Sequence, residues 1–397
     1  MVASAVICEF NPLHSGHEYI IRRMKESSDC AICIMSGAFV QRGDVAIADP
    51  YLRAQTAIRA GADIVLELPF PWSSSTAESF AEAGVNIAHR VDCDMLFFGS
   101  ESGDAEFLKS AAEATLSPNF AQNFAELSKT SLGTTASFTR AVALTLGMPD
   151  LQINANDLLG ISYMRAIQKY SLSLSPVTVK RLGDGFNSDT VSGNGYPSAT
   201  ALRRLIREAC DDTYALRQIL DGTMPADALN MLIPHCESGN APADMDRLGA
   251  FIHAYYRLAD AEELSNYAEM SGGLALKICR TARETADFNS FFDALRNRHH
   301  TDAHLRRALL FGITRVEKKD LAAPPAYTTL LAASRRGCEY LRSIKKSCGI
   351  ELVTKPADAP EGRQRQLAHK ADSLFTLSLP TPKDAAYLLR YSPYIEG

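Results

Sequence analysis

Short apolar segments alternate with amphipathic ones through the first half of the chain, and this alternation limits the possible folds more than any other feature. The apolar segments are too short for helices, whereas the segments between them place apolar residues three and four positions apart. Such alternation indicates an α/β fold with a doubly wound parallel sheet. The predicted strands are 5–8, 31–35, 64–67, 95–98 and 177–182, and the predicted helices are 16–26, 51–60, 77–91, 105–116 and 158–170.

The second half of the chain has a different pattern. From about residue 198 onward, Ala, Leu and Arg recur at helical spacing. We therefore expect an α/β domain over 1–205 and one or two mainly helical domains over 206–397. The predicted helices of this part are 200–209, 247–258, 303–311 and 328–345, and 356–360 is expected to be a loop or linker.

Charge is distributed unevenly along the sequence. The net charge of −5 argues against nucleic-acid affinity over the whole surface. Between residues 280 and 346, however, basic residues outnumber acidic ones. Three adjacent pairs stand out: Arg306-Arg307, Lys318-Lys319 and Arg335-Arg336. This distribution is compatible with a nucleic-acid partner held by one part of the protein, and equally with an ordinary solvated helix surface.

The cysteines and the apolar segments favour a cytoplasmic location. Nine cysteines are scattered along the chain, mostly beside Val, Ile or Leu, which is typical of buried thiols rather than disulfides. No apolar segment approaches membrane-spanning length, and the first residues lack the features of a secretory signal, so we expect no membrane partner. Cys30 and Cys33 have the spacing of a metal pair, but within a strand they would point to opposite faces. We therefore predict no protein metal site.

His14-Ser-Gly-His17 stands between the first predicted strand and the first predicted helix. Free N–H groups and the helix dipole make the start of a helix an anion-binding site. Two histidines can donate hydrogen bonds to phosphate oxygens, and Gly16 lets the backbone approach a nucleotide closely. Glu9, at the end of the strand, should face the same crevice and contact adenosine or a histidine. The pattern resembles the HIGH signature of nucleotidyltransferases, which attack the α-phosphate of ATP.

A second motif, Tyr196-Pro-Ser-Ala-Thr-Ala-Leu-Arg203, resembles the element that closes the nucleotide site of those enzymes. Ser198 or Thr200 can cap a helix, leaving its first N–H groups and Arg203 to hold the β- and γ-phosphates. Preorganised donors at this position lower the barrier because negative charge develops on the departing pyrophosphate. In isolation, the same residues would form a plain helix cap with an exposed arginine.

Two longer motifs carry a narrower resemblance. Glu9-Phe-Asn-Pro-Leu-His-Ser-Gly-His17 and Met35-Ser-Gly-Ala-Phe-Val-Gln-Arg-Gly43 are similar to the opening motif and the following loop of the tRNA(Met) cytidine acetate ligases. Shorter matches follow in the same order at 64–69, 97–101, 156–163 and 179–183, so that the resemblance covers about the first 205 residues. Phe10, Ser15 and Ala155 depart from the family's usual Tyr, Asn and Pro.

The resemblance implies a fold and a reaction. The fold would be a Rossmann-like HIGH nucleotidyltransferase domain over 1–205, followed by a mainly α-helical C-terminal region. Enzymes of this family form acetyl-adenylate from ATP and acetate, with Mg²⁺, and transfer the acetyl group to N4 of the wobble cytidine of elongator tRNA(Met). The second part of this chain would dock the tRNA through the three basic pairs.

The resemblance also implies roles for individual residues. His14, His17 and Arg203 would be catalytic, the histidines acting at the α-phosphate and the arginine at the pyrophosphate. Gly37 and Arg42 would bind acetate. The implied ATP ligands are Ile7, Glu9, Asn11, His14, Gly16, His17, Gly99, Asn156, Arg181, Ser198 and Thr200.

Two other functions remain open at this point. Another HIGH-type adenylyltransferase, acting on a small molecule, would explain both phosphate motifs but would leave the basic helical part without a role. A non-catalytic RNA-binding protein on the same fold would not need the two histidines and the Ser-Ala-Thr-x-x-Arg element, all of which are present.

Overall fold

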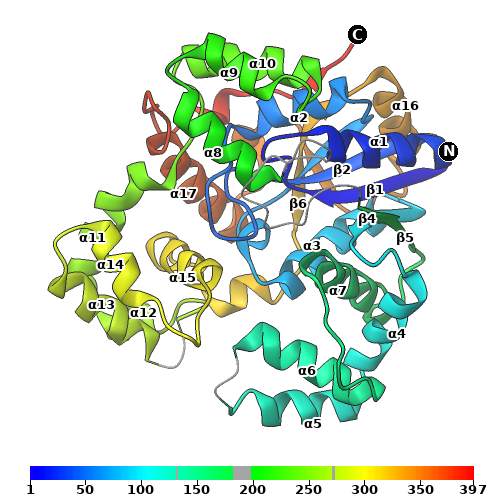
Figure 1. The fold of residues 1–397 in the computed structure, drawn as a ribbon. Coiled ribbons are helices and arrows are strands. Elements are labelled where there is room, and N and C mark those ends of the chain that lie inside the picture. Colours follow the sequence, from blue (N-terminus) through cyan, green and yellow to red (C-terminus); the bar gives the residue numbers. More distant parts are fainter. Residues whose placement is uncertain (131–132, 182–197, 271–272) are drawn as a thin grey trace.

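The computed structural model describes residues 1–130, 133–181, 198–270 and 273–397. A sheet lies at its centre (Figure 1). Its strand order is β5-β4-β1-β2-β3-β6-β7, and β8 pairs with β6. The last three strands come from the second half of the chain: β6 (Tyr327–Ala333), β7 (Glu351–Val353) and β8 (Tyr394–Ile395). The five predicted strands are confirmed and pair in parallel. They are β1 (Ala3–Cys8), β2 (Cys30–Ser36), β3 (Ile64–Leu68), β4 (Met95–Ser100) and β5 (Ser175–Lys180). The predicted end of the last strand, Leu182, lies outside the described residues.

The order of these strands determines where a ligand can bind. β1 lies between β2 and β4, so the chain reverses its direction of progress across the sheet at the β1–β4 boundary. In an open α/β sheet the loops on the two sides of such a boundary diverge, which leaves a crevice beyond the carboxyl ends of the strands.

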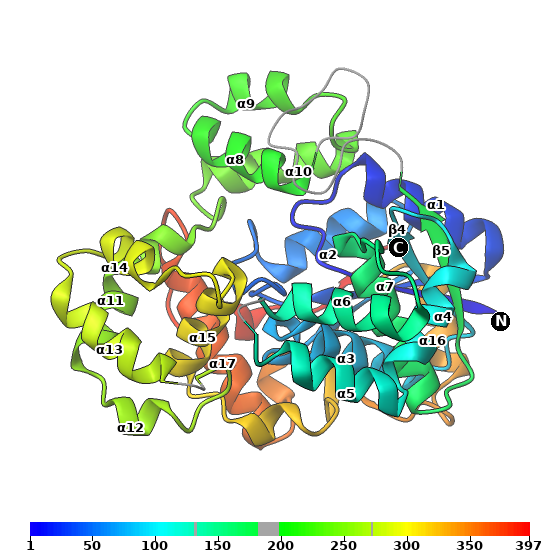
Figure 2. The same cartoon turned by 60° about the horizontal axis from the view of Figure 1, so that its bottom comes forward.

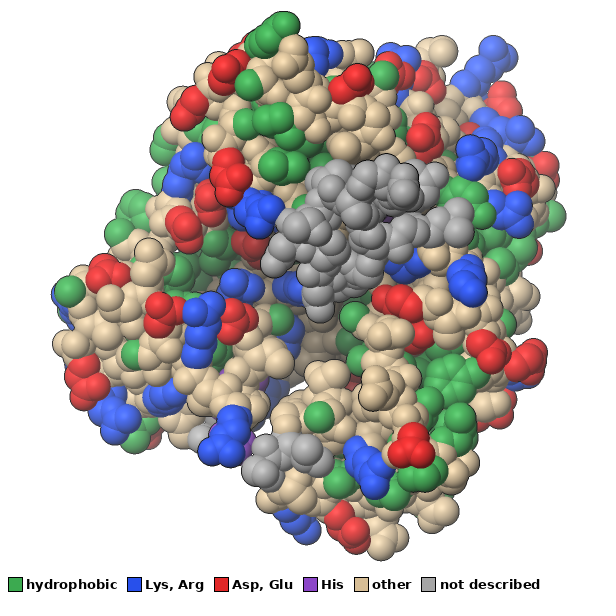
Figure 3. All heavy atoms as spheres, in the orientation of Figure 1, with side chains coloured by type: hydrophobic (Ala, Val, Ile, Leu, Met, Phe, Trp, Pro, Cys, Tyr) green, Lys and Arg blue, Asp and Glu red, His purple; other side chains and the backbone are tan. Residues whose placement is uncertain are grey.

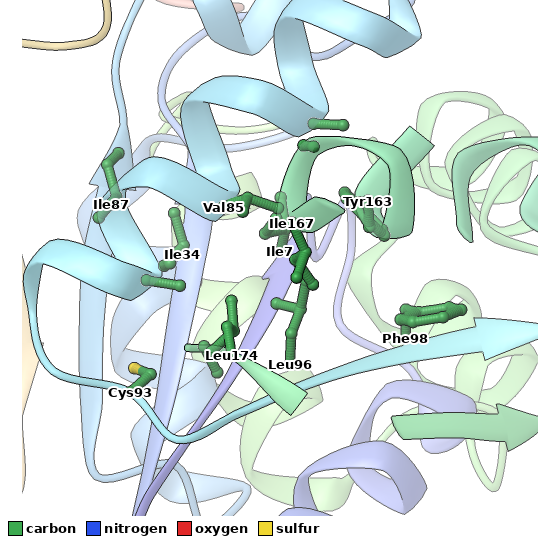
Figure 4. Close-up of a cluster of buried hydrophobic side chains, with 14 of the residues drawn as sticks. Ile7, Ile34, Val85, Ile87, Cys93, Leu96, Phe98, Tyr163, Ile167 and Leu174 are labelled. Carbon is green, nitrogen blue, oxygen red and sulfur yellow. The ribbon is translucent and has the colours of Figure 1, made fainter. Parts of the chain in front are cut away.

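Helices cover both faces of the sheet, as predicted. Along β1 the residues alternate, so that Ala5 and Ile7 join one hydrophobic cluster and Val6 and Cys8 the other. Figure 4 shows the first cluster. Five predicted helices are confirmed, within three residues at each end: α1 (Ser15–Ser27), α2 (Pro50–Arg59), α3 (Ala77–Arg90), α4 (Ala105–Thr115) and α7 (Ala155–Lys169).

Two helices in the described part of the first half of the chain were not predicted from the sequence. α5 (Pro118–Leu127) and α6 (Thr134–Leu146) pack against each other through edge-on contacts of Phe138 with Phe120 and Phe124, which stack on each other within α5. Ser117 caps α5 and Pro118 starts it, a combination typical of a helix N-terminus.

The helix predicted at 328–345 is wrong over 328–334. This segment forms β6 (Tyr327–Ala333), which pairs antiparallel with β3, and only then α16 (Arg335–Ser343). All seven residues of β6 are buried, so the strand lacks the alternation that would have distinguished it from a helix. β7 (Glu351–Val353) and β8 (Tyr394–Ile395) follow. The second half of the chain therefore completes the sheet begun by the first.

The other helices gather in two groups, visible in Figure 2. The first holds α8 (Ala199–Ala209), α9 (Thr213–Leu220) and α10 (Ala226–Glu237). The second holds α11 (Gly249–Leu258), α12 (Ala261–Leu264), α13 (Leu274–Glu284), α14 (Phe288–Leu295) and α15 (Asp302–Thr314), and α17 (Arg363–Leu377) packs beside it. Residues 356–358, in the predicted loop, form a single 3-10 turn.

The second helical group shares its hydrophobic core with the loop that follows β2. Phe39 and Val45 of this loop are buried in the same cluster as Leu305 and Phe311 of α15. Gly43 has a φ of +73°, and a Cβ at this position would lie 2.6 Å from the backbone nitrogen of Arg307. Helix α15 is thus packed directly against a loop of the α/β part. No helix in the described part of the chain is long and apolar enough to cross a membrane.

The role of β6 leads to a prediction about residues 1–205 expressed alone. This fragment would expose the edge of β3 and lose the buried side chains of Tyr327, Leu330, Leu331 and Tyr340. Each such side chain contributes about 2 kcal/mol, and a whole domain is typically stable by about 10 kcal/mol. We expect no cooperative thermal transition by circular dichroism, whereas the full chain should melt cooperatively. A cooperative transition of the fragment would contradict this prediction.

Candidate active site

A cavity of about 440 Å³ opens at the β1–β4 boundary, beyond the carboxyl ends of these strands. First-turn or cap residues of α1, α3, α6, α7 and α8 line it, so that several helix N-termini face one space. Figure 3 shows this face of the molecule hollowed between the second helical group and the α5–α6 pair. Because helix N-termini present free N–H groups and positive dipole ends, the cavity is suited to an anion.

Most of the predicted ligands meet in this cavity. Ile7, Glu9, Asn11, His14, His17, Arg42, Gly99, Asn156, Arg181, Ser198, Thr200 and Arg203 all line it. Gly16 and Gly37 are not among the lining residues. Gly16 lies beneath the imidazole of His14, where a Cβ would be 3.0 Å from Cε1, and Gly37 lies against the carboxylate of Glu67.

The two histidines of the first motif form a reciprocal cap at the start of α1. Nδ1 of His14 accepts a hydrogen bond from the Gly16 N–H at 3.1 Å, and Nδ1 of His17 accepts one from the His14 N–H at 3.3 Å. The two rings stack with centroids 3.7 Å apart. An imidazole nitrogen that accepts a hydrogen bond carries no proton, so in each neutral ring the proton lies on Nε2.

Electrostatics keep both histidines neutral. Burial, together with the positive charges of Arg181 and Arg203, lowers the pKa of His14 to about 3. Burial, His14 and Arg181 lower the pKa of His17 well below its usual value. At neutral pH the pair therefore offers two N–H donors whose tautomers are fixed by the helix cap.

Arg203 crosses the cavity from α8 to the first motif. Its guanidinium donates to the carbonyl of Asn11 at 2.8 Å and to the hydroxyl of Thr200 at 3.2 Å. Ser198 caps α8 by accepting the N–H of Ala201 at 3.1 Å. Burial lowers the pKa of Arg203, while Glu9 and Asp44 act in the opposite direction. The predicted helix cap is thus formed, and its arginine is directed at the opposite motif rather than exposed. Tyr196 and Pro197 of this motif lie outside the described residues.

Two carboxylates, Glu9 of the cavity lining and Glu101 behind the cavity residue Asn156, hold backbone N–H groups. Glu9 accepts the N–H of Gln41 at 3.0 Å and so binds the loop after β2. Glu101 accepts the amide of Asn156 and the N–H of Asp157, the latter at 3.1 Å. These bonds fix the loops around the cavity, and Glu101 also fixes the orientation of the Asn156 side chain.

Two polar atoms at the cavity lack a partner among the described residues. The Nδ2 of Asn11 and the hydroxyl of Tyr163 are buried without a hydrogen bond, and both residues line the cavity. Buried polar atoms usually have partners, so these two fit a site that binds a polar ligand. Sequence reasoning gave no role to Tyr163, although it ends the 156–163 motif.

Apolar side chains form the rest of the wall, and the sequence did not indicate them as site residues. Phe80 and Phe98, both buried, line the cavity together with Leu158 and Leu159. Their signal in the sequence is that of ordinary core residues. An apolar wall beside a group of donors is the usual composition of a nucleotide pocket.

The three basic pairs lie in different places. Arg306 is half-buried beside the loop after β2, and its charge lowers the pKa of Arg42 further, after burial. Arg307 is only 9% exposed and pairs with Glu269 at 3.2 Å. Lys318 and Lys319 are exposed, and Lys319 pairs with Glu317.

The third pair lies at the opposite edge of the sheet. Helix α16 follows Ser334, whose N–H binds the carbonyl of Asp63 directly before β3. Arg336 pairs with Asp29, directly before β2. The amino ends of the parallel strands lie here, whereas the cavity is at their carboxyl ends. The structure therefore does not bring Arg335 and Arg336 to the cavity.

A doubly wound sheet, a cavity at its strand-order reversal and a neutral histidine pair at a helix N-terminus define a nucleotidyltransferase. The model of the family described as HIGH Nucleotidyl Transferase matches residues 1–387. The match extends far beyond the first motif and includes both helical groups.

Relatives and solved structures narrow this class. The tRNA(Met) cytidine acetate ligase of Bacillus licheniformis is 30% identical over 401 residues, covering 96% of this chain and 94% of the relative. That of Acetivibrio thermocellus is 29% identical over 374 residues, covering 90% and 89%. Crystal structures of Thermotoga maritima TmcAL cover 100% of both chains, with TM-scores of 0.90 for the apo form (26% identity) and 0.87 for the form bound with alpha-thio ATP (25% identity). The chain belongs to the HIGH nucleotidyltransferase family and, within it, to the tRNA(Met) cytidine acetate ligases, as its motifs predicted.

The low pKa of His14 predicts how stability depends on pH. Below pH 6.5 the unfolded chain binds a proton at this residue, whereas the folded protein does not until about pH 3. The free energy of unfolding should therefore fall on acidification, by about 2 kcal/mol for this histidine between pH 8 and pH 5. Urea unfolding of the protein and of His14→Asn at both pH values would measure this fall. The free energy of unfolding of the variant should fall by about 2 kcal/mol less. Equal falls for the two proteins would contradict the low pKa of His14.

Proposed function

We propose that this protein is an ATP-dependent ligase that makes acetyl-adenylate and transfers its acetyl group to N4 of the wobble cytidine of elongator tRNA(Met). The observation that carries the proposal is the meeting of His14, His17, Arg181 and Arg203 in one cavity at the strand-order reversal. These groups fit the triphosphate of ATP. The apolar wall of Phe80 and Phe98 is suited to an adenine ring.

In the first step, an acetate oxygen attacks the α-phosphorus and pyrophosphate leaves. His14 and His17 would each donate an Nε2–H to α-phosphate oxygens, where negative charge accumulates. Because both rings are neutral with fixed tautomers, they stabilise this charge without having to lose or rotate a proton. Arg203, Ser198 and Thr200 would hold the leaving pyrophosphate at the N-terminus of α8, and Arg181 lies near enough to both histidines to lower their pKa values.

In the second step, N4 of cytidine attacks the acetyl carbonyl carbon, an amide bond forms, AMP leaves and N4 loses a proton. The acetate is proposed to bind beside Arg42, which lines the cavity and can attract a carboxylate. Gly37 would contribute indirectly, because it starts the loop that carries Arg42.

Mg²⁺ is proposed to arrive with the triphosphate. Within residues 1–130, 133–181, 198–270 and 273–397, no group of three or more His, Cys, Asp or Glu side chains is arranged to hold a metal ion. This composition fits an ion bound chiefly through substrate phosphates and water, as Mg²⁺ commonly is. When bound, the ion would neutralise charge on the phosphates.

The tRNA is proposed to approach over the hollowed face, where Arg306 lies beside the loop that carries Arg42. Phosphate contacts from this side would position the anticodon so that an unstacked cytidine reaches the cavity. Lys318 and Lys319 are exposed and stay candidates for further contacts. Arg307 would act through Glu269, and Arg335 and Arg336 lie at the far edge of the sheet.

The first test is ATP–pyrophosphate exchange with His14→Asn. Asparagine can cap α1 as His14 does, but it cannot supply the Nε2–H donor. We expect the acetate-dependent exchange rate to fall at least about 100-fold, the effect of losing one preorganised donor, with little change in melting temperature. His89→Asn, at the far end of α3 from the cavity, is the matched control.

The substrates separate the proposal from its alternatives. Exchange that requires acetate, followed by acetylation of the wobble cytidine on addition of elongator tRNA(Met), supports the proposal. Exchange without a response to acetate or tRNA would instead favour a small-molecule adenylyltransferase. No exchange under any condition would favour a non-catalytic RNA-binding protein.

The proposed RNA surface is tested with Arg306→Ala. A charge-assisted hydrogen bond contributes about 1.5 kcal/mol, so we expect the KM for tRNA to rise about ten-fold. The salt dependence of binding should also weaken, by about 0.7 in the slope of log K against log salt for each lost contact. Arg335→Ala, on the opposite edge of the sheet, should leave both quantities unchanged. Equal effects of the two substitutions would contradict the proposed surface.

A further inference from the structure

Arg53 is a buried cation beneath the candidate active site. It lies on α2, is only 3% exposed and is not among the residues that line the cavity. A buried arginine must have its donors satisfied, because an unpaired charge in the protein interior is strongly destabilising. The partners of Arg53 therefore show what it holds.

Among the residues that the structure describes, all the hydrogen-bond acceptors of this guanidinium are backbone carbonyls. Nε donates to Ala48 at 3.0 Å, and one terminal nitrogen donates to Glu9 at 2.6 Å. The other terminal nitrogen donates to Ser36 at 3.0 Å and to Gly37. Glu9 directly follows β1, and Ser36 is the last residue of β2. One planar group thus connects the carboxyl ends of two adjacent strands.

Neighbouring carboxyl groups oppose the effect of burial on the pKa of Arg53. Asp49, which caps α2, and Glu67 of β3 both lie close enough to act on Arg53 electrostatically, and burial lowers its pKa only to about 10. Arg53 therefore stays cationic at neutral pH. Glu67 lies against Gly37, where a Cβ would overlap its carboxylate oxygen, so the start of the loop is enclosed from this side as well.

The carbonyls held by Arg53 belong to the two segments that carry the reaction. Two residues beyond Glu9, the carbonyl of Asn11 accepts a hydrogen bond from Arg203, and the side chain of Asn11 accepts the Ile47 N–H at 2.7 Å. The Glu9 carboxylate in turn holds the N–H of Gln41, beside Arg42. Arg53 therefore lies where two segments meet: the turn from Glu9 to His17, which carries the histidines, and the loop after β2, which carries Arg42. We call this meeting point the junction.

We propose that Arg53 is a positioning residue for the adenylation step, setting the separation between the histidine pair and the loop that carries Arg42. This role rests on the proposed function. Neighbouring strands lie about 4.8 Å apart, and the planar fork of an arginine can reach the carbonyls of both. A lysine ammonium retains the charge but donates from a single atom, so Arg53→Lys should release one segment or the other.

The test compares Arg53→Lys with Arg59→Lys, a control on the same helix whose side chain is 46% exposed and pairs with Glu396. A displacement of about 1 Å in a reacting group can lower a rate about 100-fold. For Arg53→Lys we expect kcat of acetate-dependent exchange at saturating substrates to fall about ten- to 100-fold. The Kd for ATP, measured by direct titration, should change much less, because ATP binding is distributed over the whole cavity. Arg59→Lys should resemble the unmodified protein.

A second readout needs no substrate and therefore does not depend on the proposed function. The amide hydrogens of Gln41 and Ile47 bind Glu9 and Asn11, and in the unmodified protein they should exchange as slowly as those of β1 and β2. In Arg53→Lys their exchange should accelerate. If the unmodified protein showed no ATP–pyrophosphate exchange, that result alone would reject only the ligase assignment.

The positioning role itself has separate contrary outcomes. It would be overturned if Arg53→Lys folded and retained its kcat. It would also be overturned if kcat and the amount of ATP bound fell together, each in proportion to the loss of folded protein. Should Arg53→Lys fail to fold, the unmodified protein still decides: amides of Gln41 and Ile47 that exchange as freely as those of surface loops would show that Arg53 does not hold this junction.

Discussion

The reciprocal cap at the start of α1 is the interaction on which the site depends. A helix leaves its first N–H groups without intrahelical partners, and His14 and His17 occupy the positions that satisfy them. The same two hydrogen bonds use Nδ1 of each ring and so place both protons on Nε2. A requirement of helix formation thereby fixes the donors that a nucleotide would meet. Burial beside Arg181 and Arg203 completes the arrangement by keeping both rings neutral.

Around this cap, buried or partly buried side chains bind backbone groups of neighbouring loops in the α/β part. Glu9 and Glu101 bind N–H groups of neighbouring segments, and Arg53 binds carbonyls at the ends of β1 and β2. At the carboxyl edge of a parallel sheet, the last N–H and C=O groups have no ladder partners, and side chains from other elements supply them. A cavity bounded by such bonds is preorganised, which is the condition under which hydrogen-bond donors lower a reaction barrier most.

The helical groups are continuous with the α/β part rather than attached to it. β6 extends the sheet beyond β3, and the core of the second helical group includes Phe39 and Val45 from the loop after β2. Gly43 allows α15 to approach that loop through its backbone. The second helical group thus packs directly on the loop that carries Arg42. An RNA bound to this group would therefore lie next to the loop proposed to bind acetate.

The sequence by itself determined the five parallel strands and the two motifs, because period-two and period-3.6 patterns and helix caps depend on neighbouring residues. It also predicted that the histidines and Arg203 belong to one site, through family resemblance rather than geometry. Only the tertiary structure decided that 327–333 is a strand, since a segment buried on both faces carries no periodicity. The burial of Arg307 and the place of Arg53 were likewise beyond the sequence, because their partners, Glu269 and the carbonyls of Glu9 and Ser36, become neighbours only when the chain folds.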